Sequence, residues 1–449
     1  RCVESVFQSE NKTPLELVVV NDASPEPAIH EWLEQLASEK KITLILNDSN
    51  LGFVGSVNKA MRLHSERDVV LLNSDTEVAN NWLDRLTDCA AANDDIGTIT
   101  PFSNNATICS YPGFCISNEL PADESVATLD EIFSKVNTKK YIEIPTAVGF
   151  CMYISRACIN DVGYFDEKVF GRGYGEENDF SMRASIAGWR NVLLGDVFVF
   201  HKGGVSFSTE SEALQNMGLK KLLVKHPNYN ELVSQWIRRD PPREMRMAVD
   251  LVRLKKQSKP SFVFVAHGKG GGVYTHIHEL TTLFHQRLNF FLLEPYRSNE
   301  VSLSWGNQGE GFRLLFKLPD QWAKLVEVLK SLGPQRIHYH QTMGHNPLVF
   351  DLPAALSVPY DITLHDYYFV CPQIHLSDRQ GRYCGFPEYN RCPQCLAKTP
   401  APGASSAEEW RDGVRAFVTN AERVFSPSKF LTRTFSSLFP QARYVLSLI

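Results

Sequence analysis

Apolar residues in the first half of the chain form short runs that alternate with stretches of helical spacing. In order, they predict a strand at 15–20, a helix at 28–38, a strand at 42–46, a helix at 54–63, strands at 68–72 and 147–155, a helix at 180–187 and a strand at 191–200. Short buried strands separated by amphipathic helices are typical of an α/β fold with a parallel, doubly wound sheet.

The same alternation restarts in the second half. It predicts a strand at 261–266, a helix at 274–286, a strand at 288–293, a helix at 321–332, and strands at 336–340, 361–364 and 421–425. We therefore expect two α/β domains, at 1–210 and 260–449, joined by a helical basic linker at 211–259. Two interpretations of the basic residues stay open, a solvated connection or peripheral contact with the anionic face of an inner membrane.

The charge and the length of the apolar runs argue against two classes of protein, nucleic-acid-binding and membrane-spanning proteins. The chain has 449 residues with 46 Lys and Arg against 51 Asp and Glu, and this net charge of −5 gives no reason to expect a nucleic-acid partner. No apolar run approaches the roughly 20 residues of a membrane-spanning helix. Because no export signal is visible, we expect a cytoplasmic protein. The first residue is Arg1, so we expect the numbering to begin inside a longer protein.

Four of the ten cysteines fall within one short segment, at Cys371, Cys384, Cys392 and Cys395. In a chain without an export signal, a cluster that contains Cys-x-x-Cys points to metal rather than to disulfides. Four thiolates can form a closed, structural Zn²⁺ site, and the alternative is a set of unligated thiols. The other six cysteines are interpreted as small core residues or inert thiols.

Several polar residues of the first half follow predicted strands, at the edge where open α/β sheets bind ligands. Asp22 follows the first strand and can accept hydrogen bonds from a base or ribose, or form a turn. Asn73 and Asp75 follow the third, where a carboxylate can hold a hard cation against phosphate oxygens, or again form a turn. Asn50 begins a loop whose amides can approach the same ligand.

The most specific feature is the segment 170–183, Phe-Gly-Arg-Gly-Tyr-Gly-Glu-Glu-Asn-Asp-Phe-Ser-Met-Arg. Glu176, Glu177 and Asp179 stand behind three glycines at the start of a helix. Such an acidic first turn can complement the helix dipole, but the closely spaced glycines favour a backbone that bends around a ligand. His201, after the last strand, is either a metal ligand or a capped strand end.

Taken together, these motifs resemble those of family 2 glycosyltransferases. The likeness lies in Val-Asn-Asp-Ala-Ser at 20–24, Asn-Leu-Gly-Phe at 50–53, Leu-Asn-Ser-Asp at 72–75, Gly-Tyr-Gly-Glu-Glu-Asn-Asp at 173–179 with Arg183, and His-Lys-Gly-Gly at 201–204. It covers roughly residues 1–210. It implies an inverting, sugar-nucleotide-dependent enzyme of the GT-A fold, of a kind that often makes bacterial surface polysaccharides.

The resemblance also implies roles for the matched residues. Asp22 would contact the nucleobase, and Asn73 would stand beside Asp75 in the motif that binds Mg²⁺ or Mn²⁺. His201 matches a position that joins the metal or diphosphate site. Glu177 falls where the family has its general base.

Around that base, the resemblance implies that Asp179 and Arg183 support the loop, and that Glu176 and Asn50 belong with the substrate-binding residues. Two departures from the family pattern stand out. Asn73 replaces the first Asp of the metal motif, which lowers its charge. The chain also starts after the family's first strand, so we expect an incomplete GT-A domain.

In the second half, the glycines at 268 and 270–272 lie between a strand and a helix. The loop invites a dinucleotide interpretation, but Val273 stands where the fingerprint needs Gly, so phosphate or sugar binding at the helix start is the alternative. Histidines gather at strand ends, at 338, 340, 345 and 365. They form either a metal site or ordinary polar loops.

This half resembles the N-terminal, Rossmann-like acceptor domain of family 4 glycosyltransferases, which have the GT-B fold. The likeness lies in Gly-Gly-Gly-Val at 270–273 with His276, His-Tyr-His at 338–340, Thr-Leu-His-Asp at 363–366 and Phe-Ser-Pro-Ser at 425–428. It implies that Gly271 or Gly272 lies against the donor phosphate and His365 near the transferred sugar. We expect the C-terminal nucleotide domain of that fold to be missing.

The sequence therefore predicts a bifunctional, metal-dependent glycosyltransferase fragment from bacterial surface polysaccharide synthesis. Its partners would be a nucleotide-sugar donor and a glycan or lipid-linked acceptor. The alternative is a carbohydrate- or partner-binding protein that keeps transferase folds without catalysis. The acidic positions in family order favour the enzyme, whereas Asn73 and the expected loss of the first strand favour the binding protein.

Overall fold

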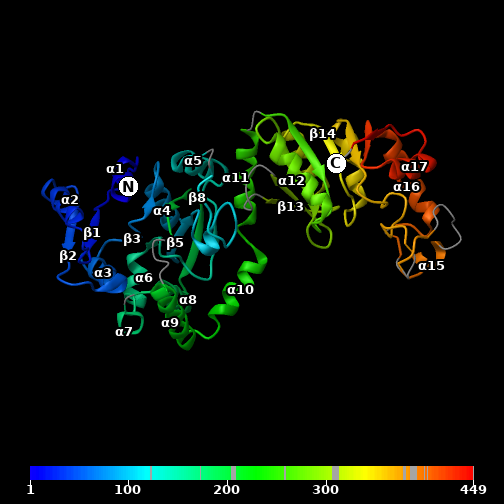
Figure 1. Ribbon diagram of the computed structural model, residues 1–449. Coiled ribbons are helices and arrows are strands. Elements are labelled where there is room, and N and C mark those ends of the chain that lie inside the picture. Colours follow the sequence, from blue (N-terminus) through cyan, green and yellow to red (C-terminus); the bar gives the residue numbers. More distant parts are fainter. Residues whose placement is uncertain are drawn as a thin grey trace. The chain divides into compact units, whose positions relative to one another are not determined.

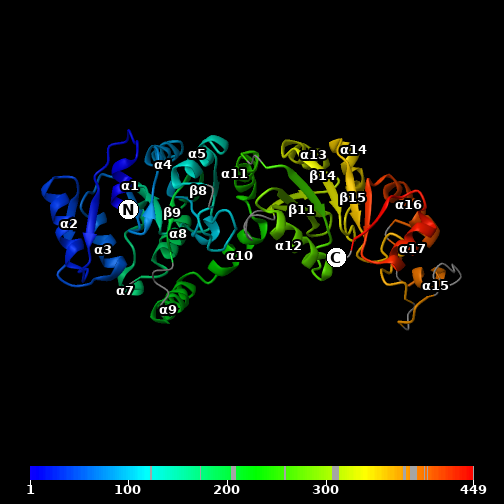
Figure 2. The same ribbon diagram turned by 45° about the horizontal axis from the view of Figure 1, so that its top comes forward.

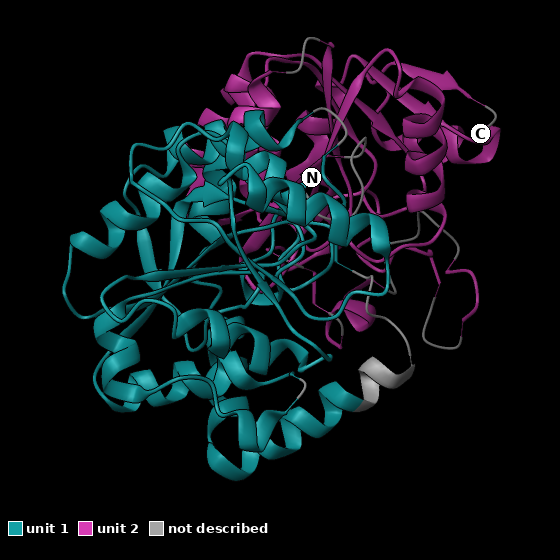
Figure 3. Cartoon of the chain, turned by 90° about the vertical axis from the view of Figure 1, so that its left-hand side faces the viewer, with its two compact units in different colours: residues 1–249 teal, residues 250–449 magenta. Residues whose placement is uncertain are grey.

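Figures 1 and 2 show a computed structural model of the chain, which contains both strands and helices along its length. It describes residues 1–449 except 122–123, 172, 204–208, 257–258, 306–312, 378–380, 385–391, 399, 402 and 448–449, and no side chain of 209–213. Two compact units are present, residues 1–249 and 250–449 (Figure 3). The predicted α/β class is confirmed for both.

Among the described residues, unit 1 holds three sheets, of two, five and two strands. Its strands are β1 (Val18–Asn21), β2 (Thr43–Leu46), β3 (Val69–Leu72), β4 (Thr76–Glu77), β5 (Ile96–Phe102), β6 (Tyr141–Glu143), β7 (Cys151–Ile154), β8 (Arg190–Phe198) and β9 (Phe200–His201). β1 and β2 pair in parallel, β4 and β9 pair antiparallel, and the largest sheet has the order β3-β7-β5-β8-β6.

The prediction of one parallel sheet in this half is wrong. β7 lies between β3 and β5 and runs antiparallel to both, and β6 runs antiparallel to β8. Among the neighbouring strands of this sheet, β5 and β8 form the one parallel pair. The apolar run that predicted β7 shows that a strand is buried but carries no signal for its direction.

The described helices of unit 1 are α1 (Cys2–Gln8), α2 (Pro27–Ser38), α3 (Gly52–Met61), α4 (Trp82–Ala91), the 3₁₀ turn η1 (Thr107–Cys109), α5 (Val126–Val136), α6 (Arg156–Val162), α7 (Glu167–Phe170), α8 (Glu176–Ile186), α9 (Thr209–Lys225) and α10 (Tyr229–Arg239). Of these helices, α2 and α3 begin within two residues of their predicted starts and α8 begins four residues before its predicted start, whereas α4, α5, α6 and α7 were not predicted. Helix α11 (Arg243–Lys255) crosses the boundary between the units.

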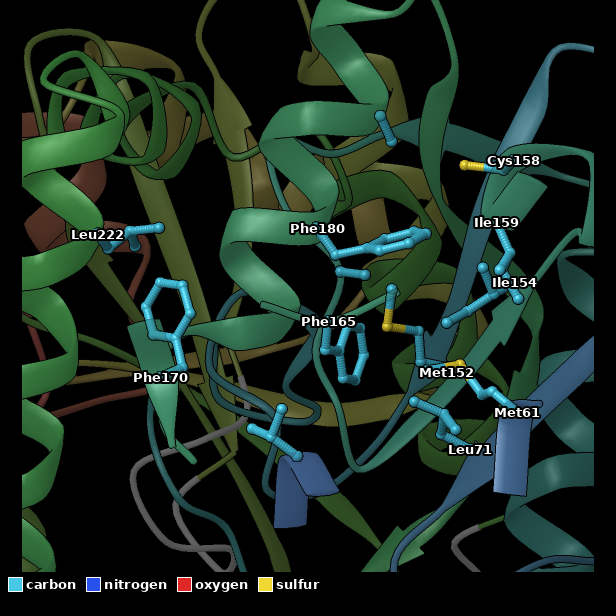
Figure 4. Close-up of a cluster of buried hydrophobic side chains, with 13 residues drawn as sticks. Met61, Leu71, Met152, Ile154, Cys158, Ile159, Phe165, Phe170, Phe180 and Leu222 are labelled. Carbon is cyan, nitrogen blue, oxygen red and sulfur yellow. The ribbon is translucent and has the colours of Figure 1, made fainter. Parts of the chain in front are cut away.

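One apolar cluster holds α8 in place. Phe180 of α8 is fully buried and meets Phe165 edge to face, with ring centroids 5.6 Å apart (Figure 4). Met152 and Ile154 of β7 and Leu222 of α9 belong to the same cluster. Because burial of one such side chain is worth roughly 1.5–3 kcal/mol, this cluster fixes the helix that carries the acidic segment.

Most of the expected linker packs as part of unit 1. The unit extends to Val249, and α9 contacts α7 and α8. Two of the basic residues that suggested a solvated or membrane-facing stretch are buried, Arg246 at 7% exposure and Arg253 at 1%. Arg246 binds Asp240 at 2.7 Å and lies over the ring of Phe114.

The described strands of unit 2 form an eight-stranded sheet with the order β13-β12-β11-β10-β14-β15-β16-β17. Its strands are β10 (Ser261–Val265), β11 (Asn289–Pro295), β12 (Glu300–Trp305), β13 (Arg313–Lys317), β14 (Pro334–Tyr339), β15 (Tyr360–Thr363), β16 (Arg423–Ser426) and β17 (Tyr444–Leu446). The strands from β11 to β17 in that order are parallel, and β12 and β13 add an antiparallel edge.

The chain leaves β10 in one direction to form β11 and later returns to its other side as β14. Such a reversal of strand order opens a crevice at the carboxyl ends of the two strands. The helices of this unit are α12 (Gly272–Phe284), α13 (Trp322–Ser331), η2 (Pro347–Asp351), α14 (Leu352–Leu356), α15 (Cys392–Leu396), α16 (Ala407–Asn420) and α17 (Lys429–Leu438). Across the described part of the chain, none of the helices has both the length and the apolar character needed to cross a membrane.

Candidate functional site

A left-handed turn leads into the acidic helix of unit 1. Gly173, Tyr174 and Gly175 have φ values of +132°, +72° and +99°, and α8 begins directly afterwards. A Cβ at position 175 would lie 3.0 Å from the Phe170 ring, so this position needs glycine for space as well as for conformation. Tyr174 has a side chain and is therefore strained in this left-handed conformation. Backbone strain of this kind is common at ligand sites.

Glu176 and Glu177 form a buried carboxyl pair at the start of α8. Glu176 is 4% exposed, and Oε2 of each residue is buried with no hydrogen-bond partner among the described residues. Burial, and then the neighbouring Glu177 charge, raise the pKa of Glu176 to about 8. Burial also raises the pKa of Glu177. Because like charges this close disfavour double ionisation, the pair retains a proton near neutral pH.

Asp179, one turn later, is paired with cations instead. It is fully buried and lies 2.9 Å from Arg183 Nε, 2.7 Å from Lys225 Nζ and 2.9 Å from His226 Nε2. Burial would raise its pKa, but the hydrogen bonds from Lys225, His226 and Arg183 outweigh that effect and lower it. Arg183 also donates to the Tyr164 carbonyl at 2.9 Å. Asp179 and Arg183, which were both predicted as site residues, therefore hold α8 against its neighbours.

The short β4–β9 pairing brings Asp75 and His201 together. Thr76 is opposite His201 in this ladder, and Asp75 Oδ1 lies 3.4 Å from His201 Nε2. The hydrogen bond with His201 lowers the pKa of Asp75. Burial works against charge on His201, but Asp75 outweighs it and raises the pKa of the imidazole. Two motifs that are distant in sequence thus form one polar pair.

Residues Gly149 and Phe150, just before β7, connect this pair to the acidic helix. The Phe150 ring stacks on His201 with centroids 5.4 Å apart, and its carbonyl accepts the Asn73 N–H at 2.9 Å. A Cβ at position 149 would lie 3.7 Å from Glu177 Cγ. The predicted metal motif, His201 and the predicted base therefore surround one segment.

Asp22 and Asn50 hold the loop that starts α3. The Asp22 carboxylate accepts the N–H groups of Leu51 at 2.8 Å and Gly52 at 2.9 Å, and the Asn47 amide at 2.8 Å. Burial works against its charge, but these hydrogen bonds outweigh burial and lower the pKa of Asp22. Asn50 is exposed, and its Oδ1 caps the Gly52 amide at 3.1 Å.

This loop also meets the glycine turn. A Cβ at Gly173 would lie 3.5 Å from Cβ of Phe53 and 3.9 Å from a Glu176 carboxylate oxygen. The first-half residues singled out in the sequence therefore form one continuous region.

Sequence reasoning missed four contributors to this region. Gly149 and Phe150 lie in an apolar run without a polar signal, and Lys225 and His226 lie in the stretch interpreted as a linker. Only the fold shows that Phe150 packs against His201 and that Lys225 and His226 bind Asp179 of the acidic helix. The adjacent basic residues Lys225 and His226, within the stretch predicted to be helical, were the one available signal.

In unit 2, the glycine loop and His365 lie at the reversal between β10 and β14. Gly270 and Gly271 have φ values of +71° and +77°, and a Cβ at 271 or 272 would meet nothing within 4 Å, so the space beside this loop is open. His365 Nε2 lies 3.2 Å from His340 Nδ1. Burial lowers the pKa of His365 to about 4 and holds that of His340 far below its usual range.

The four clustered cysteines line one small cavity. Cys371, Cys384, Cys392 and Cys395 surround it together with Leu396 and Ala407, and none of the four forms a disulfide. Burial raises the pKa of the Cys371 and Cys392 thiols. The fold therefore brings together thiols from three separate points of the segment.

Comparisons with known proteins bear mainly on unit 1. Residues 1–163 match the family model described as Glycosyl transferase family 2. The chain is 27% identical over 164 residues to an uncharacterized protein of Mycobacterium tuberculosis (strain ATCC 25618 / H37Rv), a match that covers 36% of this chain and 57% of the relative. It is 28% identical over 95 residues to an uncharacterized glycosyltransferase of Haemophilus influenzae, covering 21% and 29%. The chain thus spans little more than half of the mycobacterial relative.

Two solved structures show a weaker likeness. A crystal structure of GalNAc-T7 with UDP, GalNAc and Mn²⁺ has a TM-score of 0.36 at 15% identity, covering 56% of this chain and 52% of that chain. The mannosyltransferase PcManGT from Pyrobaculum calidifontis, in complex with GDP-Man and Mn²⁺, has a TM-score of 0.37 at 14% identity, covering 63% and 75%. Both scores are too low to carry an argument about this chain.

Proposed function

We propose that unit 1 is a glycosyltransferase that moves a sugar from a nucleotide-diphosphate sugar to a glycan or lipid-linked acceptor. One observation carries the proposal. Asp75, His201 and Glu177 surround the segment formed by Gly149 and Phe150, in a unit whose first 163 residues match a glycosyltransferase family. The proposal includes a GT-A fold for unit 1.

The pair of Asp75 and His201 fits a divalent cation. His201 Nδ1 faces the Asn105 carbonyl at 2.7 Å, which favours a proton on that nitrogen, so Nε2, which faces Asp75, would be the nitrogen that a cation binds in place of a proton. The Asp75 carboxylate oxygen suits Mn²⁺ or Mg²⁺, with Asn73 nearby on the same turn, and His201 would add one imidazole nitrogen. When bound, the cation supplies positive charge against the departing diphosphate.

Glu177 would act as the general base. The acceptor hydroxyl oxygen attacks the anomeric carbon from the face opposite the diphosphate, so the new carbon–oxygen bond forms as the old one breaks and the configuration inverts. The hydroxyl proton passes to the Glu177 carboxylate. Burial raises the pKa of Glu177 towards the range in which a carboxylate accepts a proton well. Glu176 beside it would retain a proton and contact substrate.

The remaining residues would position the donor and the helix. Asp22 Oδ2 accepts the Gly52 N–H and has a second lone pair for a base or ribose donor, and exposed Asn50 lies on the same loop. Asp179 and Arg183 would act through α8 rather than touch substrate, because their charged groups already bind each other and neighbouring elements.

Unit 2 would be the acceptor domain of a family 4, GT-B-type transferase, with Gly271 and Gly272 against a phosphate and His365 near a sugar. The open space beside the loop and the positive φ at Gly271 support that assignment. The cysteine-lined cavity would hold a structural Zn²⁺. The whole protein would serve bacterial surface polysaccharide synthesis, with peripheral contact to the inner membrane.

Turnover of sugar nucleotides tests the proposed function. The purified chain is supplied with UDP- and GDP-sugars, Mn²⁺ or Mg²⁺ and candidate acceptors, and release of nucleoside diphosphate is followed. Glu177→Gln and Asp75→Ala should each lower kcat by about 10²–10⁴-fold. The matched control Glu131→Gln, an exposed carboxylate on α5, should keep the wild-type rate.

Unchanged rates in Glu177→Gln and Asp75→Ala would overturn the site assignment. A wild-type chain that binds sugar nucleotides without turning them over would support the alternative, a binding protein that keeps a transferase fold.

A further inference from the structure

Three histidines of unit 2 lie close together beyond the carboxyl ends of its strands. His276 belongs to α12, which follows β10, whereas His340 follows β14 and His365 follows β15. One ring nitrogen from each lies within 4.8 Å of the other two. The three elements are successive in the sheet around the reversal of strand order, where open α/β sheets bind ligands.

The distances suit a metal ion. His340 Nδ1 and His365 Nε2 are 3.2 Å apart. Two nitrogens bound to Zn²⁺ at its usual 2.0–2.1 Å, at tetrahedral angles, are about 3.3 Å apart. The His276 ring centroid lies 5.5 Å from that of His340 and 5.3 Å from that of His365. A small rotation of this half-buried side chain would bring its nitrogen to the same point.

Protein partners do not satisfy the cluster. His340 is 2% exposed, and its Nε2 has no hydrogen-bond partner among the described residues. By contrast, the adjacent His338 binds the Thr363 hydroxyl through Nε2 at 2.7 Å. A single contact between His340 and His365 leaves further ring nitrogens of these histidines unused.

We propose that His276, His340 and His365 bind a Zn²⁺ ion with the fourth coordination position open. Three imidazole ligands are a donor set that zinc uses where it also binds water or substrate. Open space beside Gly271 and Gly272, at the start of the helix that carries His276, gives an oxygen ligand access. This site lies in unit 2 and is independent of the transferase chemistry proposed for unit 1.

Zinc binding to the full chain tests the proposal. The cysteines are a second candidate zinc site, so the measurement uses a Cys392→Ser/Cys395→Ser background, stripped with a chelator. Zn²⁺ is then titrated against a chromophoric competitor, and Co²⁺ absorption reports tetrahedral coordination by nitrogen and oxygen. We expect one high-affinity Zn²⁺ per chain.

His276→Ala should weaken this Zn²⁺ at least about tenfold, since even outer partners of metal ligands are worth 10–100-fold. The matched control is His278→Ala, an exposed histidine two residues further along the same helix, which should leave the affinity unchanged. His276 is partly exposed, so its removal should leave the fold intact, and circular dichroism checks this. His365→Gln provides a second variant with the same expectation.

Equal zinc affinity in His276→Ala and His278→Ala would overturn the proposal, as would the absence of any tight Zn²⁺ in the background protein. Loss of glycosyl transfer in unit 1 variants would not affect either outcome.

Discussion

Both units bury ionisable side chains near their candidate sites, but they accommodate them in different ways. In unit 1, Asp179 stays charged because Arg183 of α8, Lys225 at the end of α9 and the following His226 surround it. In unit 2, burial keeps His340 and His345 neutral. Asp179 is therefore held by ion pairs across elements, and the two histidines by the exclusion of charge. Substitutions and pH should affect the two units differently.

Neutralising a buried carboxylate gives the largest expected contrast. Asp179→Asn should destabilise unit 1 by about 3–5 kcal/mol, because Arg183 and Lys225 lose their buried counter-charge. Asp361→Asn should destabilise unit 2 by less than half of that free energy. Burial already raises the pKa of Asp361, although Arg336 lies 3.0 Å away, so its charge contributes less to stability. Hydrogen exchange of the amides of α8 and β15 measures both. Equal losses would contradict the distinction.

Two buried groups, Glu176 in unit 1 and His345 in unit 2, should contribute pH dependences of opposite sign. The folded pKa of Glu176, about 8, lies above its usual value of 4.5, so its contribution to stability is lost as pH rises from about 4.5 to 8. The folded pKa of His345, about 4, lies below its usual 6.5, so its contribution is lost as pH falls from about 6.5 to 4.

Proteolysis in urea, with each cleavage assigned to its unit by mass spectrometry, follows the two stabilities across this range. Glu176→Gln should flatten the profile of unit 1 alone, and His345→Gln that of unit 2 alone. A profile that changes in the other unit would contradict the assignment.

Two left-handed glycines sharpen the comparison at a smaller scale. Gly175→Ala combines a φ of +99° with a Cβ 3.0 Å from the Phe170 ring, and should cost about 1–3 kcal/mol or more. Gly271→Ala has a φ of +77° with a ψ of −161°, a conformation that is nearly restricted to glycine, but open space around its Cβ, so conformational strain of about 1–3 kcal/mol remains without the steric overlap. Thermal unfolding of the two variants should show the larger shift for Gly175→Ala.

The smallest expected effect concerns a helix cap of unit 2. The Ser428 hydroxyl accepts the Leu431 N–H at 3.2 Å, and Ser428→Ala should destabilise α17 by about 1 kcal/mol. Hydrogen exchange should rise in residues 429–438 and stay unchanged in unit 1. Faster hydrogen exchange in both units would contradict the prediction that the loss of this cap affects α17 alone.

The sequence predicted much of the fold because alternating apolar runs mark buried strands directly. β1, β8 and β10 fall where these runs lie. The direction of β7 could not be predicted, since parallel and antiparallel neighbours bury the same apolar face. The antiparallel edge of β12 and β13 was missed entirely.

The candidate site likewise contains residues that the sequence predicts and residues that it does not. Asp75, Glu177 and His201 were singled out because carboxylates and histidines at strand ends carry a chemical signal. Phe150 carries none, although it lies against His201 and bonds Asn73. Lys225 and His226 were assigned to a linker because their partner, Asp179, is distant in sequence. Long-range pairing of this kind is visible only in the fold.

The two-residue ladder between β4 and β9 has a consequence for the order in which the protein is built. The amide of Gly203 donates to the carboxylate of Asp75, 128 residues earlier in the chain. Contacts between such distant segments form late in folding, because a long loop must close first. A growing chain on the ribosome therefore carries Asp75 without its histidine until β9 has emerged, and the pair completes only after most of unit 1 has been synthesised.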